Sequence, residues 1–441
     1  MARPASLSGF PEFLPEGRIV EQRLLAELTT VFELHGFASV ETRAIEPLEV
    51  LTGKGEIDKE IYAVARYQGE GADPDWALHY DLTVPFARYV LEHAGHLNFP
   101  FRRYQIQKVW RGERPQDGRF REFTQADVDI VGQDQLAEHH DAEIVAVAAE
   151  GFARLQADLG LPPARLRVNN RKLAEGFYRG LGVTDTGAVL QRIDKLAKIG
   201  PDRVATLLTD ECGMDRAAAQ ACLDLATIST TDESFVERVT ALGVSDPLLD
   251  EGLEQLATVL RTTAATGVVH ADLSIARGLD YYTGTVMETE LAGYEKLGSV
   301  ASGGRYDQLA SDGRKTYPGV GFSFGVSRML VPLIGDGAIT ATRSVPTCVL
   351  VAVDSEDTRA EAVAVAGQLR ARGIATEVAP TADKFGKQIR HADRRGIPYV
   401  WFSREDGDQV KDIRSGDQVA TDPQTWLPPQ EDLRPRVHPV T

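Results

Sequence analysis

The sequence predicts an α+β protein, in which an antiparallel sheet domain with a helical insertion is followed by a small α/β domain. Residues 104–113 and 122–131 read as two strands of a long antiparallel hairpin joined by a polar loop. Residues 171–262 are rich in Leu, Ala and charged side chains and carry few strand signals, which indicates a helical insertion. Beyond residue 346, apolar strands alternate with helical stretches.

The other elements of the first domain, predicted to span residues 1–334, follow from periodicity. Residues 16–35 keep leucines at helical spacing before Gly36, which can end a helix. Along 122–131, polar Gln125, Asp127 and Asp129 share one face of the strand, so one face is wet and the other faces the core. The remaining predictions are a helix at 135–159, strands at 281–290 and 298–302, and a strand running into a helix at 319–330.

The C-terminal part is predicted to be a small parallel-sheet domain over residues 346–420. A linker without periodicity at 335–345 precedes it, and a Pro-rich tail at 421–441 is expected to be loose. Strand–helix alternation is typical of parallel α/β units. The predicted strands are 348–353, 375–379 and 397–402, and the predicted helices are 356–372 and 383–395.

Composition excludes several classes of protein. No apolar run reaches the roughly 18 residues of a membrane span, and the N-terminus lacks the apolar stretch of a signal peptide, so a cytoplasmic protein without membrane contact is expected. The three cysteines form no C-x-x-C pair, which argues against a disulfide framework or a zinc knuckle. The run EHHD at 138–141 would fan out around a helix, so no metal site is predicted there.

Charge is distributed unevenly. The formal net charge of −17 argues against a non-specific nucleic-acid coat. Residues 102–121 nevertheless hold seven basic and two acidic side chains, a local balance of +5. Such a run is most often a solvated face, but this one coincides with the predicted hairpin.

The hairpin carries the side chains that could do chemistry. Arg111 and Glu113 are two apart on a predicted strand and so face the same way; a guanidinium there can clamp a phosphate or carboxylate through two parallel hydrogen bonds. Arg119 lies in the loop, and the Phe123 ring offers a surface for stacking a base. From these residues alone, an ordinary surface hairpin with weak ion pairs remains an equal alternative.

Sequence motifs decide between these interpretations. WRGERPQDGRFREF (110–123) resembles motif 2 of class II aminoacyl-tRNA synthetases, and GFSFGVSR (321–328) resembles motif 3, with Ser323 in place of the central glycine. ARGLDYYTGTVME (276–288) and SGGRYDQL (302–309) resemble the two signatures of histidyl-tRNA synthetases. The resemblance covers about residues 9–334, and 345–415 is similar to the anticodon-binding domain of that family. Motif 1 departs from the pattern, because Arg43 stands where proline is expected.

The resemblance implies a two-step ligase reaction. The carboxylate of L-histidine attacks the α-phosphate of ATP and releases pyrophosphate, with Mg²⁺ assisting; the histidyl group then passes to the 3′ end of tRNA(His). It also implies a homodimer. The implied catalytic residues are Arg111, Arg277 and Arg328, and the implied ATP-binding residues are Arg111, Glu113, Arg119, Phe123 and Arg328.

The resemblance also assigns the two other substrates. The implied histidine-binding residues are Asp81, Thr83, Arg111, Gln125, Asp129, Arg277, Tyr281, Tyr282 and Tyr306. The implied tRNA contacts are Arg114 and Gln116 beside the acceptor end, and Lys387 and Arg390 on the predicted C-terminal helix. Plain strand packing of the paired tyrosines and a merely solvated helix remain the alternatives.

Three other functions are alternatives to histidine–tRNA ligation. A regulatory paralogue from histidine biosynthesis would not charge tRNA, but such proteins lack the anticodon domain and usually lose key arginines, which this chain keeps. A class II synthetase for another amino acid would lack R-G-L-D-Y-Y and S-G-G-R-Y-D. A ligase acting on a small molecule is opposed only by the C-terminal domain and the basic hairpin.

Overall fold

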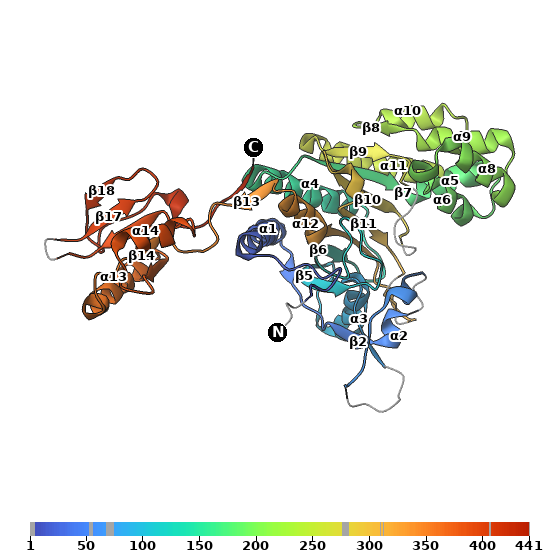
Figure 1. The fold of residues 1–441 in the computed structure, drawn as a ribbon. Coiled ribbons are helices and arrows are strands. Elements are labelled where there is room, and N and C mark those ends of the chain that lie inside the picture. The colour runs from blue at the N-terminus through green and yellow to red at the C-terminus, as the bar shows by residue number, and fades with distance from the viewer. Residues whose placement is uncertain are drawn as a thin grey trace. The chain divides into compact units, whose positions relative to one another are not determined.

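The computed structural model describes residues 5–52, 56–67, 75–275, 282–308, 310–311, 313–404 and 407–440. The chain forms two units (Figure 1). The first comprises Met1–Pro11, Leu25–Ala157 and Leu161–Pro332, and the second comprises Glu12–Leu24, Asp158–Gly160 and Leu333–Thr441. None of the helices in the described ranges is long and apolar enough to cross a membrane.

A nine-stranded sheet organises the first unit. Its order is β1-β5-β6-β12-β11-β10-β7-β9-β8. Neighbours from β5 to β7 are antiparallel, whereas β1 pairs with β5 and β9 with β7 in parallel. The strands are β1 (Ala38–Ser39), β5 (Phe101–Trp110), β6 (Glu122–Val131), β7 (Ala164–Asn170), β8 (Ser229–Thr230), β9 (Val269–Asp272), β10 (Thr285–Leu291), β11 (Ala301–Tyr306) and β12 (Gly319–Gly325).

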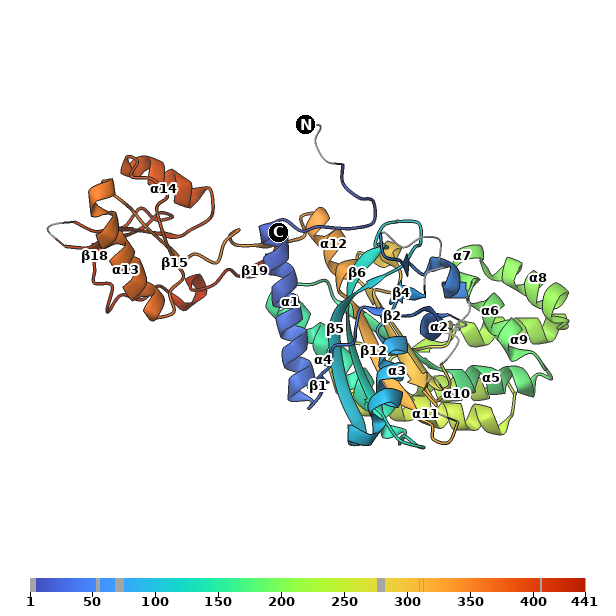
Figure 2. The ribbon, with the colours of Figure 1, turned by 90° about the horizontal axis from the view of Figure 1, so that it is seen from below.

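One face of this sheet is covered by two long helices, α1 (Pro15–Leu34) and α4 (His139–Leu159), as Figure 2 shows. The ring of Phe152 of α4 packs at a tilt against that of Phe324 of β12, with centroids 5.0 Å apart, and the ring centroids of Phe32 of α1 and Tyr104 of β5 are 5.6 Å apart. Side chains alternate along a strand, so Ser323 of β12 lies on the opposite face. The sheet therefore has one apolar face under helices and one face left for polar side chains.

The open face is bordered by a small three-stranded sheet and helix α3 (Thr83–His93). The small sheet has the order β2-β4-β3. Its strands are β2 (Ile45–Pro47), β3 (Ala63–Val64) and β4 (Trp76–Leu78), with the short helix α2 (Leu48–Leu51) after β2.

The predicted hairpin is confirmed, with one correction to its first strand. β5 ends at Trp110, so Arg111 and Glu113 lie in the loop rather than on the strand. The backbone leaves the ladder because the Gly112 nitrogen donates to the Glu60 carbonyl at 2.7 Å. The Arg111 nitrogen still donates to the Arg121 carbonyl at 3.0 Å, which holds the two arms of the loop together. β10 and β11 also begin later than predicted, at Thr285 and Ala301.

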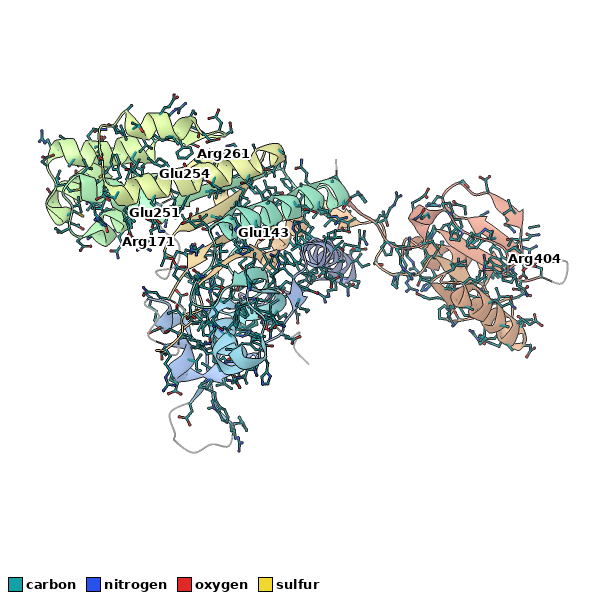
Figure 3. The ribbon with its side chains drawn as sticks, turned by 180° about the vertical axis from the view of Figure 1, so that it is seen from behind. Glu143, Arg171, Glu251, Glu254, Arg261 and Arg404 are labelled. Carbon is teal, nitrogen blue, oxygen red and sulfur yellow. The ribbon has the colours of Figure 1, made fainter. Side chains whose placement is uncertain are left out.

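The helical insertion is confirmed (Figure 3). Two glycines allow α5 and α11 to cross closely: a Cβ on Gly176 would lie 2.1 Å from the Leu249 nitrogen, and one on Gly252 would lie 2.2 Å from the Leu173 nitrogen. A Lys172–Glu251 ion pair of 2.6 Å joins the same helices. The helices are α5 (Arg171–Gly180), α6 (Thr186–Ile193), α7 (Leu196–Ile199), α8 (Pro201–Cys212), α9 (Arg216–Ala226), α10 (Ser234–Thr240) and α11 (Pro247–Thr263).

The C-terminal sheet has five strands, in the order β15-β14-β16-β17-β18. The three predicted strands are parallel, as expected, but β17 and β18 extend the sheet in antiparallel fashion. The elements are α12 (Val326–Gly335), β13 (Ile339–Ala341), β14 (Val349–Val351), α13 (Arg359–Ala371), β15 (Thr376–Val378), α14 (Phe385–Asp393), β16 (Tyr399–Phe402), β17 (Gln409–Asp412), β18 (Gln418–Ala420) and β19 (Val437–Pro439).

The expectation of a loose tail is wrong. The Trp426 ring packs edge-on against Tyr399 and Trp401, with centroids 5.2 and 5.7 Å away. Asp432 accepts hydrogen bonds from the Tyr399 hydroxyl at 2.7 Å and from Arg414 at 2.8 Å. β19 then pairs with β13, so the predicted linker also contains a strand. Proline-rich composition suggested disorder, but a few aromatic and acidic anchors are enough to fix the segment.

Removing residues 422–441 is therefore expected to lower the unfolding temperature of the C-terminal sheet. The deletion takes away the partly buried Trp426 and uncovers Tyr399 and Trp401. Loss of a fully buried tryptophan costs about 3–5 kcal/mol, so a smaller but measurable loss of stability is expected. Thermal unfolding followed by tryptophan fluorescence measures the effect. Leu427→Ala is the matched control, since that side chain is exposed. An unchanged transition after the deletion would show that the tail is loose after all.

Candidate active site

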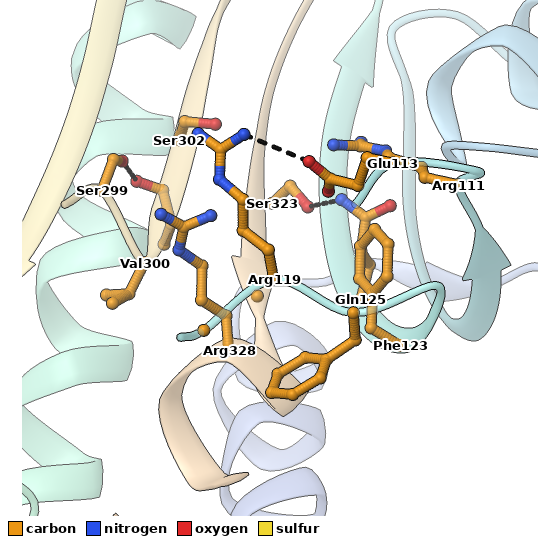
Figure 4. Close-up of a pocket in the computed structure, with 14 residues that line it drawn as sticks. Arg111, Glu113, Arg119, Phe123, Gln125, Ser299, Val300, Ser302, Ser323 and Arg328 are labelled. Carbon is orange, nitrogen blue, oxygen red and sulfur yellow. Dashed lines mark hydrogen bonds and ion pairs between the residues drawn. The ribbon is translucent and has the colours of Figure 1, made fainter. Parts of the chain in front are cut away.

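The open face of the large sheet carries a cavity with about 550 Å³ of empty space, counting the part that is open to solvent. It lies between the loop joining β5 and β6, the strands β11 and β12, and the start of α12 (Figure 4). Three guanidinium groups from two distant stretches of the chain line it, those of Arg111, Arg119 and Arg328. The other lining residues are Glu113, Gly118, Phe120, Phe123, Gln125, Ser299, Val300, Ala301, Ser302, Ser323 and Gly325.

Two of these arginines are held in place from behind. Arg111 donates from Nε to the Tyr80 carbonyl at 3.0 Å, and its guanidinium carbon lies 5.1 Å from the centre of the Phe123 ring. Arg328 donates to the Leu297 carbonyl. The pKa of Arg328 is lowered by burial first and then by the positive charges of Arg119 and Arg111. Repulsion among the three guanidinium groups would be relieved by an anion between them, so their arrangement indicates an anion-binding pocket.

Arg119 and Glu113 form an ion pair of 3.1 Å across the mouth of this cavity (Figure 4). Arg119 is about half exposed, so the pair contributes little to stability. The contact does position the Arg119 guanidinium, and a phosphate could compete with the Glu113 carboxylate for it.

A second, smaller cavity adjoins the first, because Ser302 and Ser323 line both; its empty space is about 230 Å³, again counting the part that is open to solvent. Its walls combine carboxylates with tyrosines. Asp129 accepts hydrogen bonds from the Tyr306 hydroxyl at 2.8 Å and forms a 2.7 Å ion pair with the fully buried Arg103. The remaining lining residues are Thr83, Asp127, Tyr282, Gly303, Gly304, Gly321 and Phe322.

Glycines in β11 and β12 make room for these walls. A Cβ on Gly321 would lie 2.0 Å from Oδ1 of Asp129, one on Gly319 would lie 2.4 Å from the Tyr306 ring, and one on Gly304 would lie 2.9 Å from the Tyr282 ring. Real Cβ contacts are not found at such distances. The glycine-rich sequence of these strands is thus explained by side chains that lie flat on the sheet.

Burial controls the ionisation of the carboxylates. It raises the pKa of Asp81 to about 6, while the Val84 nitrogen, Arg111 and Arg103 act in the opposite direction. Burial likewise raises the pKa of Asp127 to about 7, against the lowering influence of Arg103. Buried carboxylates of this kind favour a cationic ligand, because a positive charge beside them restores the ionised form.

The structure brings most of the implied residues together. Arg111, Glu113, Arg119, Phe123, Gln125 and Arg328 line the larger cavity, and Thr83, Asp129, Tyr282 and Tyr306 line the smaller one. Asp81 lines neither; it is buried behind them and accepts from the Val84 nitrogen at 3.1 Å. Arg277 and Tyr281 lie outside the described residues.

Sequence reasoning left out several residues of the cavities. Asp127 was recognised on the polar face of its strand but not assigned, although its position between Gln125 and Asp129 was the available signal. Ser302 and Ser323, which join the cavities, and Arg103, which pairs with Asp129, were not assigned either. Nothing in the sequence indicates that Arg103 is fully buried, because it lies within a run of basic residues.

The implied tRNA contacts are on the surface. Arg114 and Gln116 are exposed in the β5–β6 loop. Lys387 and Arg390 are exposed on α14, where Lys387 pairs with Asp383 at 2.9 Å.

Comparison with known proteins agrees with this geometry. The family model described as histidyl-tRNA synthetase matches residues 9–329. The chain belongs to the histidyl-tRNA synthetase family. A second model, described as an anticodon binding domain, matches residues 347–403, which hold most of the C-terminal sheet. The predicted class II synthetase fold is therefore confirmed.

Individual members of the histidyl-tRNA synthetase family match over nearly the whole length. The histidine–tRNA ligase of Cutibacterium acnes is 59% identical, with 99% of each chain covered. The crystal structure of histidyl-tRNA synthetase from Nostoc sp. PCC 7120 superposes with a TM-score of 0.84 at 34% identity, covering 96% of this chain and 97% of that one. An ATP phosphoribosyltransferase regulatory subunit/histidyl-tRNA synthetase from Bacillus halodurans shares the fold, with a TM-score of 0.72 at 19% identity over 88% of this chain and 96% of that chain.

Gly321→Ala is expected to raise the histidine KM at least about tenfold, because the new Cβ would displace the Asp129 carboxylate, which it approaches to 2.0 Å. Histidine-dependent ATP–pyrophosphate exchange measures the change. Gly95→Ala is the control, since nothing lies within 4 Å of its Cβ position. A Gly321→Ala enzyme with a normal KM would show that Asp129 does not define the histidine pocket.

Proposed function

We propose that this chain activates L-histidine with ATP in the two joined cavities and then transfers the histidyl group to the 3′ end of tRNA(His). One observation supports the proposal above all: a cavity lined by Arg111, Arg119 and Arg328 opens into a small polar pocket with Asp129 and Tyr306 in its walls. The positive charges of the first suit a triphosphate, and the carboxylates and hydroxyls of the second suit a small cationic amino acid.

The first step needs positioning and charge stabilisation more than proton transfer. The carboxylate of histidine is already ionised at neutral pH and attacks the α-phosphate directly, with pyrophosphate as the leaving group. Negative charge grows on the phosphate oxygens, and fixed guanidinium groups stabilise it without reorganising. Arg111 lines the larger cavity and lies close enough to the buried Asp81 to lower its pKa, so we assign it to the histidine carboxylate and α-phosphate.

The other groups of the larger cavity then take the rest of ATP. Arg119 and Arg328 would hold the β- and γ-phosphates, with Glu113 released from its ion pair as the phosphates arrive. Phe123 offers its ring to adenine. Arg277 keeps its proposed role beside the α-phosphate on the strength of the sequence motif.

Histidine selection would come from hydrogen bonds rather than from editing. Asp81, Thr83, Gln125 and Asp129 would serve the ammonium side, and Tyr281 and Tyr282, with Tyr306 nearby, would offer hydrogen-bonding groups to the imidazole ring. A site built to hydrogen-bond its substrate rejects analogues lacking those atoms by up to about 10⁴–10⁵.

Magnesium is proposed to enter together with ATP. Among the described residues no group of three or more His, Cys, Asp or Glu side chains could hold a metal ion. Mg²⁺ commonly takes substrate phosphates and water as its main ligands, with one or two carboxylates. When bound, it would neutralise phosphate charge alongside the arginines.

The partners follow from the same proposal. Arg114 and Gln116 would contact the acceptor end of tRNA(His), and Lys387 and Arg390 its anticodon stem. Their exposure supports this, since each can reach a phosphate without unfolding. A homodimer acting in the cytoplasm is the working arrangement that the family resemblance suggests.

ATP–pyrophosphate exchange against a panel of amino acids tests the proposed function. Exchange should depend on histidine and be at background with the other amino acids. Exchange driven by a different amino acid would point to another specificity, and no exchange with any would favour a regulatory protein of the same fold.

Deleting residues 345–441 should reduce tRNA charging much more than adenylate formation, because the cavities lie entirely in the first unit. A loss of about tenfold or more in charging, with exchange within about threefold of the full chain, is expected from losing the exposed basic contacts of α14. Equal losses in both assays would contradict the proposal that the C-terminal domain serves tRNA binding and not adenylate formation.

A further inference from the structure

Asp127 lies where the two cavities meet. In the sheet its register partner on β12 is Ser323, which lines both cavities, and its partner on β5 is the buried Gln105. Along β6 it stands between Gln125, in the larger cavity, and Asp129, in the smaller one. Asp127 itself is only 3% exposed and lines the smaller cavity.

The neighbouring carboxylates already have partners. Asp129 is engaged by Arg103 at 2.7 Å and by the Tyr306 hydroxyl at 2.8 Å, and Asp81 accepts from the Val84 nitrogen. Oδ1 of Asp127, in contrast, is buried and has no hydrogen-bond partner among the described residues. A buried carboxylate oxygen that receives no hydrogen bond destabilises the fold. Its presence in a cavity wall therefore indicates that a group of the bound ligand donates a hydrogen bond to it.

The position of Asp127 identifies that group. The carboxylate of the bound amino acid must reach the arginines of the larger cavity, so its α-carbon lies near the junction marked by Ser302 and Ser323. The ring must then extend toward the tyrosines of the smaller cavity, Tyr282 and Tyr306. The ammonium group, attached to the α-carbon, is the only donor of the substrate that stays at the junction.

We propose that Asp127 is a further substrate-binding residue, whose free carboxylate oxygen receives the ammonium group of the amino acid. The inference rests on the proposed function, because it takes the amino acid to bind in the smaller cavity. It adds a further carboxylate to the ammonium subsite and gives the site a negative charge that matches the positive charge of the substrate.

The ionisation of Asp127 agrees with this role. Burial raises its pKa to about 7, Asp129 and Asp81 add to the rise, and Arg103 and the Ser323 hydroxyl oppose it. The other polar side chains of the cavity are those of Thr83, Tyr282, Ser302 and Tyr306. Below pH 7 the free site holds a proton that must leave before the ammonium can bind. Affinity for the amine should thus increase as the pH rises through about 7 and level off above it.

Asp127→Asn tests the proposal, because it keeps the shape and removes the charge. The variant should raise the histidine KM by about 10–100-fold, the range for losing a hydrogen bond to a charged group, with a smaller change in kcat. Calorimetric binding of histidinol, which keeps the amine, should weaken as much as that of histidine. Binding of 3-(imidazol-4-yl)propionate, which lacks the amine, should be equal for both proteins.

The ratio of variant to wild-type KM should also increase between pH 6 and pH 8, and taking the ratio cancels the titration of histidine itself. Asp141→Asn is the matched control: it is equally buried but pairs with Arg305 outside the cavities, so it should lower the unfolding temperature without this pattern. An unchanged histidine KM in Asp127→Asn, or equal weakening of the amine-free analogue, would overturn the inference. A wild-type protein without histidine-dependent exchange would instead defeat the proposed function.

Discussion

Replacing Arg111 by alanine is expected to slow histidine-dependent ATP–pyrophosphate exchange by about 10²–10³-fold, the scale for removing one preorganised charge stabiliser. The reason lies in how the side chain is fixed. Its Nε is held by the Tyr80 carbonyl and its plane lies near the Phe123 ring, which leaves the outer nitrogens for the substrates. The loss should appear mainly in kcat, because the interaction strengthens as charge develops on the phosphate.

A second variant, Arg111→Lys, separates the effect of the positive charge from that of the guanidinium geometry. Lysine keeps the positive charge but cannot form two parallel hydrogen bonds, so it should recover only part of the rate. Arg102→Ala is the control from β5, the strand that leads into the loop of Arg111: its side chain pairs with Glu143 at 2.6 Å and lies over Phe37, away from the cavity. Exchange in that control should stay within about twofold of wild type. A comparable rate loss for Arg102→Ala would show that the effect of Arg111→Ala is not specific to the site.

Sequence patterns predicted well the strands and helices that surround the site, because periodicity depends on local backbone geometry. The alternation of polar and apolar residues along 122–131 placed Gln125 and Asp129 on one face, and both line the cavities. The helical insertion and the three parallel strands of the C-terminal sheet were also predicted, since periodicity and strand–helix order are local properties. Arg111, Arg119 and Arg328 came from sequence motifs, and they line one cavity.

What the sequence did not predict depends on contacts between distant residues. Arg103 reads as one more basic residue of an exposed run, yet it is completely buried against Asp129 and the Phe86 ring. The free oxygen of Asp127 becomes visible only once the donors around it are known. The ordered tail follows the same rule, because Trp426 finds its partners on β16 and not in its own sequence neighbourhood.

Arg328→Met is expected to have opposite effects on stability and on catalysis. A lowered pKa means that folding disfavours the charged guanidinium, so the positive charge of Arg328 costs stability in the free protein at neutral pH. Its Nε is also buried without a partner among the described residues. Methionine keeps the apolar stem and removes the charge, so the unfolding temperature of the free protein should be unchanged or higher.

The same substitution should lower kcat/KM for ATP by about 10²–10³-fold, since it removes one of the three guanidinium groups that we propose to face the phosphates. It should also weaken the stabilisation of the protein by ATP. Arg305→Met provides the contrast: Asp141 and Asp307 raise the pKa of Arg305, so its removal should lower the unfolding temperature. If Arg328→Met instead destabilised the free protein and left ATP use intact, Arg328 would be a structural residue. The predicted combination, higher or unchanged stability with lower activity, is the one expected when the charge of Arg328 binds ATP but destabilises the free protein.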